Sequence, residues 1–340
     1  MRPSPLFFLP LLFLGGLLPA KAAEVQFGFL LRPGDTHAGI PLVRPALYSG
    51  TVASVDPSGF RILDRSYPPI EARKLSGWGL EPCYLEIESC PANRTLEGER
   101  WEVDTGRSLS MPGYFALKAE SWNTRPDLPR DLAGAIYSIR PHWTLDTLMS
   151  PVRGSDVLRS SRSGDADRVA IFDPAHPKSY RRFFAREVSP AGDWEWSAVD
   201  PKERNSRVIP PGHGWAFRRE ADHNLNLGLT GEPRACALRV PLRKGMNLVA
   251  PGYLRTTSLR QFAQGPAYGF RPGAKPGLAD RISLFRREAV DTFALLDPGW
   301  TSLRSLRGVD PEVAMQVRPG EAVQIQKVEA DADFVFPLQP

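Results

Sequence analysis

One six-residue segment occurs twice in this chain, and in both places a similar turn and strand follow it. DRVAIF (Asp167 to Phe172) returns as DRISLF (Asp280 to Phe285). The first copy is followed by VIPPGHGWAFRRE (Val208 to Glu220), and the second by MQVRPGEAVQIQKVE (Met315 to Glu329). Each of these carries a Pro-Gly turn and then a strand pattern. Because the elements recur in a fixed order, the sequence predicts one β-rich folding unit that is used twice.

The punctuation of the chain is typical of an all-β protein. Its 34 prolines and 29 glycines fall between short apolar runs,. Leu47 to Asp64, for example, predicts two strands joined by a turn at residues 57–59,. Ser302 to Val313 is the nearest candidate for a helix, but Gly308 and Pro311 interrupt it,. We therefore expect an N-terminal β-barrel or sandwich-like domain followed by two related β-sandwich-like modules.

The first residues have the pattern of a secretory signal peptide. Arg2 supplies a positive charge, Leu6 to Pro19 is a short apolar run, and Ala20-Lys21-Ala22 is typical of a cleavage site before Ala23,. No later run reaches the ~18–20 apolar residues that a membrane-spanning helix needs. The sequence predicts a secreted mature chain without a transmembrane segment, located in the periplasm, at the cell surface or in the medium.

These patterns divide the chain into four predicted segments. They are a signal peptide (1–22), an N-terminal β-domain (23–146), a first module copy (147–228) and a second module copy (229–340). Within the two copies, Leu148 and Pro151 occupy places that match those of Leu248 and Pro251.

The two copies resemble the "GWNLxxxP … PGxGYW" β-module of secreted bacterial proteins. GMNLVAP (Gly245 to Pro251) matches the start of that module, and PGHGWAF (Pro211 to Phe217) matches its end. Met246 departs from the pattern where the module has Trp, and Glu321-Ala322 replace the Gly-aromatic pair. The resemblance implies a β-fold and secretion. It carries over no activity and no catalytic residue.

More broadly, the chain is similar to an uncharacterised family of secreted verrucomicrobial β-proteins. Two short strand motifs precede the modules in that family, an SGTV type and a PxWTL type. They match Ser49 to Val52 and Pro141 to Leu145 here. This likeness covers most of the mature chain, and it too implies fold and secretion only.

Charge and motif content exclude several function classes. The net charge of +5 falls by two when Arg2 and Lys21 are cleaved off, and the remaining arginine doublets form no stripe. We therefore expect neither nucleic-acid binding nor a polybasic membrane contact. No GxSxG, GxGxxG or P-loop motif occurs, so no cofactor is predicted. The five histidines are His37, His142, His176, His213 and His223, and none has the spacing of a metal site,.

Two local features concern single residue types. His213 lies in a Pro-Gly-His-Gly turn, which predicts an exposed imidazole. Cys83 and Cys90 flank one strand and can pair only if that segment turns, because an extended strand separates them too far. Cys236 is predicted to be a buried thiol.

Glu86 and Glu88 are the best candidates for catalysis. Two residues apart on the strand YLEIES, they project from one face, and paired carboxylates on a sheet are what retaining glycoside hydrolases use. The competing interpretation is an ordinary amphipathic strand, with the glutamates in solvent and Cys83, Leu85 and Ile87 in the core. The sequence favours this second interpretation.

Trp194, Trp196 and Trp215 suggest a binding site instead. Trp194 and Trp196 alternate along one strand, so both rings lie on one face, where sugar rings can stack. Burial of these rings in a β-core is the alternative, and the sequence favours it. An arginine directly follows both Asp167 (in DRV) and Asp280 (in DRI). This predicts a repeated Asp-Arg pairing that fixes a turn.

The leading functional hypothesis is therefore a secreted, non-catalytic structural or interaction protein of the cell envelope or extracellular space. Its expected partner is a polysaccharide or another envelope protein. The alternative is an extracellular carbohydrate-active enzyme that uses Glu86 and Glu88.

Overall fold

The computed structural model describes most of the chain after the predicted signal peptide. The described residues are 24–66, 81–111, 113–120, 122–149, 156–173, 180–189, 192–200, 207–258, 269–286, 289–297, 299–303, 314–329 and 332–337. Several sequence predictions lie outside them: the signal peptide, Pro151, His176 and most of Ser302 to Val313.

The all-β prediction is confirmed. Within the described ranges, helical structure is limited to short pieces, none longer than two turns. These are α1 (Thr105–Ser110), α2 (Leu145–Leu148) and the 3-10 turns Arg94–Leu96, Arg130–Leu132 and Pro276–Leu278. No helix among these residues is long and apolar enough to cross a membrane.

Six strands close into a barrel in the order β3-β4-β7-β6-β5-β8. They are β3 (Tyr48–Asp56), β4 (Arg61–Asp64), β5 (Cys83–Ser89), β6 (Arg100–Val103), β7 (Tyr114–Lys118) and β8 (Ile136–Pro141). Residues 57–60 form the predicted turn between β3 and β4. Alternate side chains such as Leu85, Trp101 and Ile139 fill the barrel. All three cysteines are free and buried, as an extended β5 requires for Cys83 and Cys90,.

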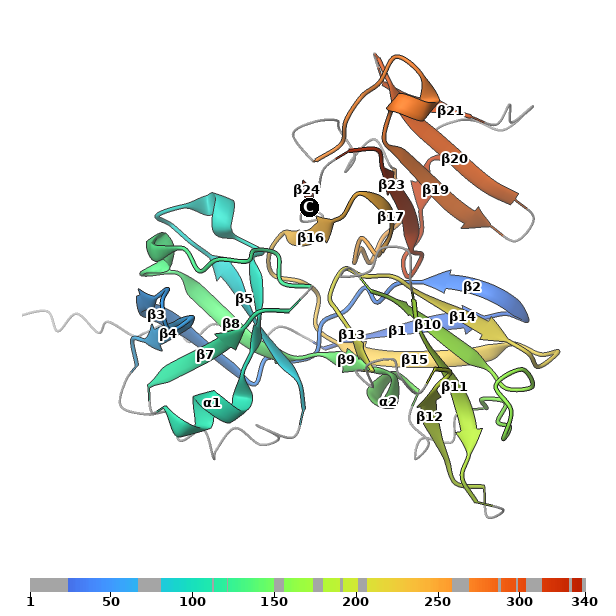
Figure 1. Ribbon diagram of the computed structural model, residues 1–340, viewed down its shortest axis with the longest axis horizontal. Helices are drawn as coiled ribbons and strands as arrows, with labels where there is room; N and C mark the ends of the chain where they lie inside the picture. Colours follow the sequence, from blue (N-terminus) through green and yellow to red (C-terminus); the bar gives the residue numbers. More distant parts are fainter. Residues whose placement is uncertain are drawn as a thin grey trace, which may run out of the picture.

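A first module surrounds its own apolar core beside the barrel (Figure 1). Its five-stranded sheet runs β12 (Trp194–Ala198), β11 (Tyr180–Glu187), β10 (Arg168–Phe172), β14 (Trp215–Arg219) and β2 (Gly34–Ala38). Two antiparallel pairs complete it: β1 (Val25–Leu31) with β15 (Leu225–Gly231), and β9 (Trp143–Thr144) with β13 (Val208–Ile209).

A second module has the corresponding strand order around a separate core. Its sheet runs β21 (Gly299–Ser302), β20 (Ala289–Leu296), β19 (Arg281–Arg286), β23 (Val323–Lys327) and β17 (Gly245–Val249). Its pairs are β16 (Leu238–Leu242) with β24 (Ala332–Phe336), and β18 (Thr257–Ser258) with β22 (Gln316–Val317). Register corresponds too, since Ile171 faces Trp215 in the first sheet and Leu284 faces Val323 in the second.

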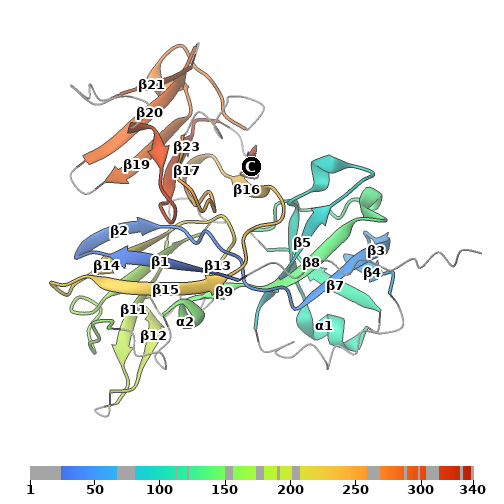
Figure 2. The same cartoon turned by 180° about the vertical axis from the view of Figure 1, so that it is seen from behind.

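The first module is discontinuous in sequence, which differs from the predicted division at residue 146. β1 and β2 precede the barrel, yet they pair with β15 and β14, which follow it. Figures 1 and 2 show these blue strands beside yellow ones. The whole barrel thus lies between β2 and β9, where the second module has only residues 250–256. Leu148, expected near the start of a copy, lies in α2 instead. Strand pairing over such distances leaves no local signal in the sequence.

The modules contact each other reciprocally through their Pro-Gly turns. The amide of Gly39, just after β2, donates to the Gly320 carbonyl of the second module at 2.8 Å. In the other direction, the amide of Ala250, just after β17, donates to the Gly212 carbonyl at 2.8 Å. Gly212 and Gly320 have φ values of 80° and 78°, a left-handed conformation that glycine adopts without strain. Each turn therefore lies against the edge strand of the other module.

Each module also contains a buried aspartate that is paired with a buried cation. Asp167 pairs with Arg219, and Asp280 pairs with Lys327. The predicted pairing of each aspartate with the next residue is wrong for Asp167, because Arg168 contacts Glu220 instead. Adjacent side chains on a strand point to opposite faces of the sheet. The side chain that follows the buried aspartate therefore points to the other face and cannot pair with it.

Candidate functional site

Glu86 and Glu88 lie on the outer face of β5, while Cys83, Leu85 and Ile87 point into the barrel, as predicted. The outer face, however, is not solvent. Glu86 is only 2% exposed and accepts a hydrogen bond at 2.6 Å from Nη2 of Arg234, in the segment between the two modules. The expected solvent-facing position of Glu86 is therefore wrong, because other parts of the chain cover this side of the strand.

Glu88 belongs to the same set of contacts. It accepts hydrogen bonds from the Ser138 hydroxyl and, at 3.0 Å, from Nη2 of Arg140. Nη1 of Arg140 donates at 2.6 Å to Glu232, which follows β15 of the first module. Glu86 is thus in an ion pair between the barrel and the intermodule segment. Glu88 pairs within the barrel with Arg140, and the other nitrogen of Arg140 makes the contact to Glu232 outside it.

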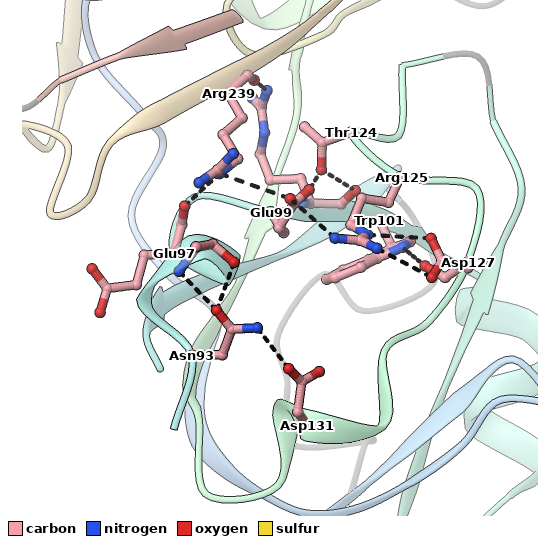
Figure 3. A network of polar contacts seen from close by, with 11 residues as sticks. Asn93, Glu97, Glu99, Trp101, Thr124, Arg125, Asp127, Asp131 and Arg239 are labelled. Carbon is pink, nitrogen blue, oxygen red and sulfur yellow. Dashed lines mark hydrogen bonds and ion pairs between the residues drawn. The ribbon is translucent and has the colours of Figure 1, made fainter. Parts of the chain in front are cut away.

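Two further arginines make contacts between the barrel and the rest of the chain. Arg100 of β6 donates to the Pro211 carbonyl at 2.8 Å and to the Arg239 carbonyl. Arg239 of β16 reaches back to the barrel, where its Nε donates to the Glu97 carbonyl at 2.8 Å and lies 3.8 Å from Glu99 (Figure 3). We call this set the junction: Glu86, Glu88, Glu97, Glu99, Arg100 and Arg140 of the barrel with Pro211, Glu232, Arg234 and Arg239.

The contacts of the junction attach the barrel to the two modules and to the segment between them. A glycosidase carboxylate must be available to a sugar oxygen or to the anomeric carbon at the floor of a cleft. Here an arginine contacts Oε1 of each glutamate, and Glu86 is covered. Removal of one partner would leave a buried charge unpaired, which typically costs about 3–5 kcal/mol. The geometry therefore favours adhesion of the barrel to the modules over acid-base chemistry.

Sequence reasoning missed a buried polar cluster beside the junction. Nε2 of His142 lies 2.7 Å from Oε2 of Glu102, and both side chains are buried. The same oxygen accepts a hydrogen bond from the Trp122 indole at 3.0 Å. Nδ1 of His142 has no hydrogen-bond partner among the described residues. These residues come from separate parts of the chain, so no motif spacing signals them.

His213 is buried, which corrects the prediction of an exposed imidazole. It is 2% exposed and lies parallel to Phe172 at 6.3 Å between ring centres. With Tyr84 and Arg234 it lines a cavity of about 20 Å³, room for one water molecule. Burial, and then the charge of Arg100, lower the pKa of His213 to about 3. The Pro-Gly turn that suggested a surface loop is instead covered by the second module.

Trp194, Trp196 and Trp215 belong to the core of the first module. Trp194 is 5% exposed, and the other two are fully buried. Trp194 and Trp196 do share one face, with ring centres 5.4 Å apart at 81°. That face is the inner one. A stacking platform for sugars needs exposed rings, so these residues do not form one, and the core alternative applies.

Because Trp196 is a core residue, replacing it should affect stability. Trp196→Phe removes a hydrogen bond from the indole to the Met149 carbonyl at 3.2 Å and leaves a small cavity. We expect the free energy of unfolding to fall by about 1–3 kcal/mol. Urea denaturation measures this loss. Trp300 is the control. It pairs with Leu295 in the second module, as Trp196 pairs with Ala185 in the first, and it is only half-buried. Trp300→Phe should cost less, and equal costs would contradict the assignment.

A second cavity lies where the intermodule segment meets the second module. Its volume is about 190 Å³, and it is lined by Arg234, Cys236, Tyr253, Leu254, Arg255 and Phe336, with Leu238, Gly252 and three prolines. Burial raises the pKa of the Cys236 thiol. Within the described ranges, no group of three or more His, Cys, Asp or Glu side chains is placed to hold a metal ion.

Comparison of the chain with protein-family models, with curated proteins and with solved structures finds no match.

Proposed function

We propose that the protein is a secreted, non-catalytic structural or interaction protein of the cell envelope or extracellular space. The observation that carries the proposal is the engagement of Glu86 by Arg234 and of Glu88 by Arg140. Glu86 joins the barrel to the segment between the modules, and Glu88 holds Arg140, which in turn bonds to Glu232 after the first module's β15. A protein that fixes its parts in this way is suited to presenting surfaces to a partner.

We further infer that the two modules are copies of one unit and that the barrel is an insertion in the first copy. The corresponding strand orders support this, as do the two buried aspartate-cation pairs. Segments 34–39 and 245–250 hold corresponding places, since each forms an edge strand that ends against the Pro-Gly turn of the other module. In the first copy, Gly34 to Gly39, ahead of the barrel, then takes the place that Gly245 to Ala250 holds at the start of the second.

An envelope protein is favoured over a polysaccharide as the partner. The polysaccharide hypothesis depended on Trp194, Trp196 and Trp215, whose rings are buried. Secretion is supported by the N-terminal pattern and by the resemblance to the "GWNLxxxP … PGxGYW" modules of secreted bacterial proteins.

Export and catalysis can be tested with one preparation. The full chain is expressed in a bacterium with its own N-terminus, and the exported form is sequenced. We expect Ala23 as its first residue. The same material is incubated with a panel of polysaccharides beside Glu86→Gln and Glu88→Gln variants, and released reducing ends are measured.

Retention of the whole chain in the cytoplasm would overturn the secreted assignment. For catalysis, we expect no release above that of heat-denatured protein from any of the three preparations. Release by the wild type that is lost in Glu86→Gln would instead establish the carbohydrate-active enzyme.

A further inference from the structure

Three large apolar side chains are exposed on the five-stranded sheet of the second module. Met246 of β17 is 40% exposed, Val290 of β20 is 46% exposed, and Leu303, directly after β21, is 39% exposed. β20 and β21 lie away from the barrel in both views (Figures 1 and 2). Scattered apolar residues are ordinary on a protein surface, so these matter only if they share one face.

The strand pattern places all three on the outer face of this sheet. Each lies three positions along the chain from a residue that belongs to the module core or packs against it, namely Val249, Phe293 and Trp300. Side chains alternate along a strand, so residues three positions apart point to opposite faces. The pairing of β21 with β20 continues to Leu303, whose amide donates to the Thr292 carbonyl at 2.8 Å.

The corresponding face of the first module is charged. Three positions carry exposed charges in the first module and uncharged side chains in the second. By strand register they are Asp35, Arg182 and Arg218 in the first module, and Met246, Thr292 and Gln326 in the second. Arg281, at the first position of β19, is charged like its counterpart Arg168. Since both modules have the same strand order, the fold does not require this difference. It changes what the face can contact.

One corner of the outer face is already covered by the other module. Phe285 stacks on the ring of His37 in the first module, with ring centres 4.0 Å apart. Leu248 belongs to one apolar cluster with Phe172 of the first module. The outer faces of two related modules thus pack against each other within the chain. Val290 pairs directly with Phe285, so the exposed surface continues this interface.

We propose that the outer face of the second module packs against the same face of a second copy of this chain, forming a twofold dimer. A twofold interface brings one patch against itself and must therefore be self-complementary. An uncharged face with apolar side chains meets this condition. The face of the first module is a poorer partner, because Arg182 and Arg218 would lose their water.

This inference goes beyond the proposed function, because it identifies a surface and its partner. Export and the release of reducing ends can be measured whatever the oligomeric state. Failure of the dimer would therefore leave the proposed function standing, and the reverse holds too.

The test is analytical ultracentrifugation of the mature full chain over a range of protein concentrations. We expect a reversible equilibrium between monomer and dimer. Val290→Arg should raise the dissociation constant of the dimer about tenfold or more, because the guanidinium would lose water against an apolar surface. Val188→Arg is the matched control. Val188 is 53% exposed and directly follows β11 of the first module, so this variant should associate like the wild type.

A second variant guards against misfolding of the first. Thr292→Arg gives the second module the residue type that the first module has at the corresponding place, Arg182, and should also weaken the dimer. A monomer at every concentration would overturn the proposal. A dimer that neither Val290→Arg nor Thr292→Arg weakens would overturn it as well, since the interface would then lie elsewhere.

Oxidation of methionine tests the face in the unchanged protein. Met246 lies on the face, whereas Met111 is a partly exposed residue of the barrel and serves as the internal reference. With hydrogen peroxide in excess, raising the protein concentration through the dimer equilibrium should slow oxidation of Met246 several-fold relative to Met111, as read by mass spectrometry. An unchanged ratio of the two rates would contradict burial of this face in the dimer.

Discussion

Replacing Asp167 or Asp280 with alanine is expected to lower the free energy of unfolding of its module by about 3–5 kcal/mol. Each change leaves a buried cation without a counter-charge, Arg219 in the first module and Lys327 in the second. The backbone also loses an acceptor, since Asp167 receives the amides of Leu158 and Glu220.

Asp280 has the corresponding backbone partners, the amides of Arg271 and Val328. Hydrogen exchange with mass spectrometry assigns each loss to its module. Asp167→Ala should speed exchange in β10 and β14 first, and Asp280→Ala in β19 and β23.

Arg168→Gln is the matched control for this prediction. Arg168 follows Asp167 directly, but its partner Glu220 is partly exposed and so is Arg168 itself. Exposed ion pairs contribute about 0–1 kcal/mol, so this variant should keep nearly wild-type stability. A large loss in Arg168→Gln together with a small one in Asp167→Ala would reverse the assignment in favour of pairing between sequence neighbours.

Acid is expected to destabilise the protein through His213. The pKa of this side chain is about 3 in the folded protein and ~6.5 in the unfolded chain. The unfolded chain therefore takes up the proton first as pH falls. The stabilising contribution is fully present above pH ~6.5 and is lost as pH falls towards 3. At ~1.4 kcal/mol per unit, the loss is about 3 kcal/mol by pH 4.

His213→Gln isolates this effect from the protonation of carboxylates, which also lowers stability in acid. The variant loses the ring contact with Phe172 at every pH, so its baseline is set at pH 8. Urea denaturation at pH 8 and pH 4 should then show the wild type losing about 3 kcal/mol more than the variant. Parallel losses in the two proteins would mean that the pKa of His213 is the same in the folded protein and in the unfolded chain.

The positions of the charges explain why the aspartate pairs and His213 dominate these expectations. Asp167, Asp280 and His213 lie in places that water hardly reaches. Charges in such places are weakly screened, so a missing counter-charge or an added proton changes the folding free energy strongly. His223, by contrast, is exposed and contacts Asp222 and Asp156. Its titration should change stability little.

Part of the candidate site was predictable from sequence. The alternation of β5 correctly places Leu85 and Ile87 inside the barrel and Glu86 outside it. It could not show that Arg234, 148 residues away along the chain, would cover Glu86. The pattern of Trp194 and Trp196 likewise predicts one shared face, but a period of two does not say whether that face is the inner or the outer one.

The sequence by itself determined the all-β class, the strands DRVAIF and DRISLF, and their Pro-Gly turns. These are local properties, set by alternation and by backbone preferences of proline and glycine. Only the tertiary structure decided that β1 and β2 join strands beyond the barrel, that Asp167 pairs with Arg219, and that His213 is buried. Those outcomes depend on which distant segments pack together, and burial and ion pairing arise from that packing.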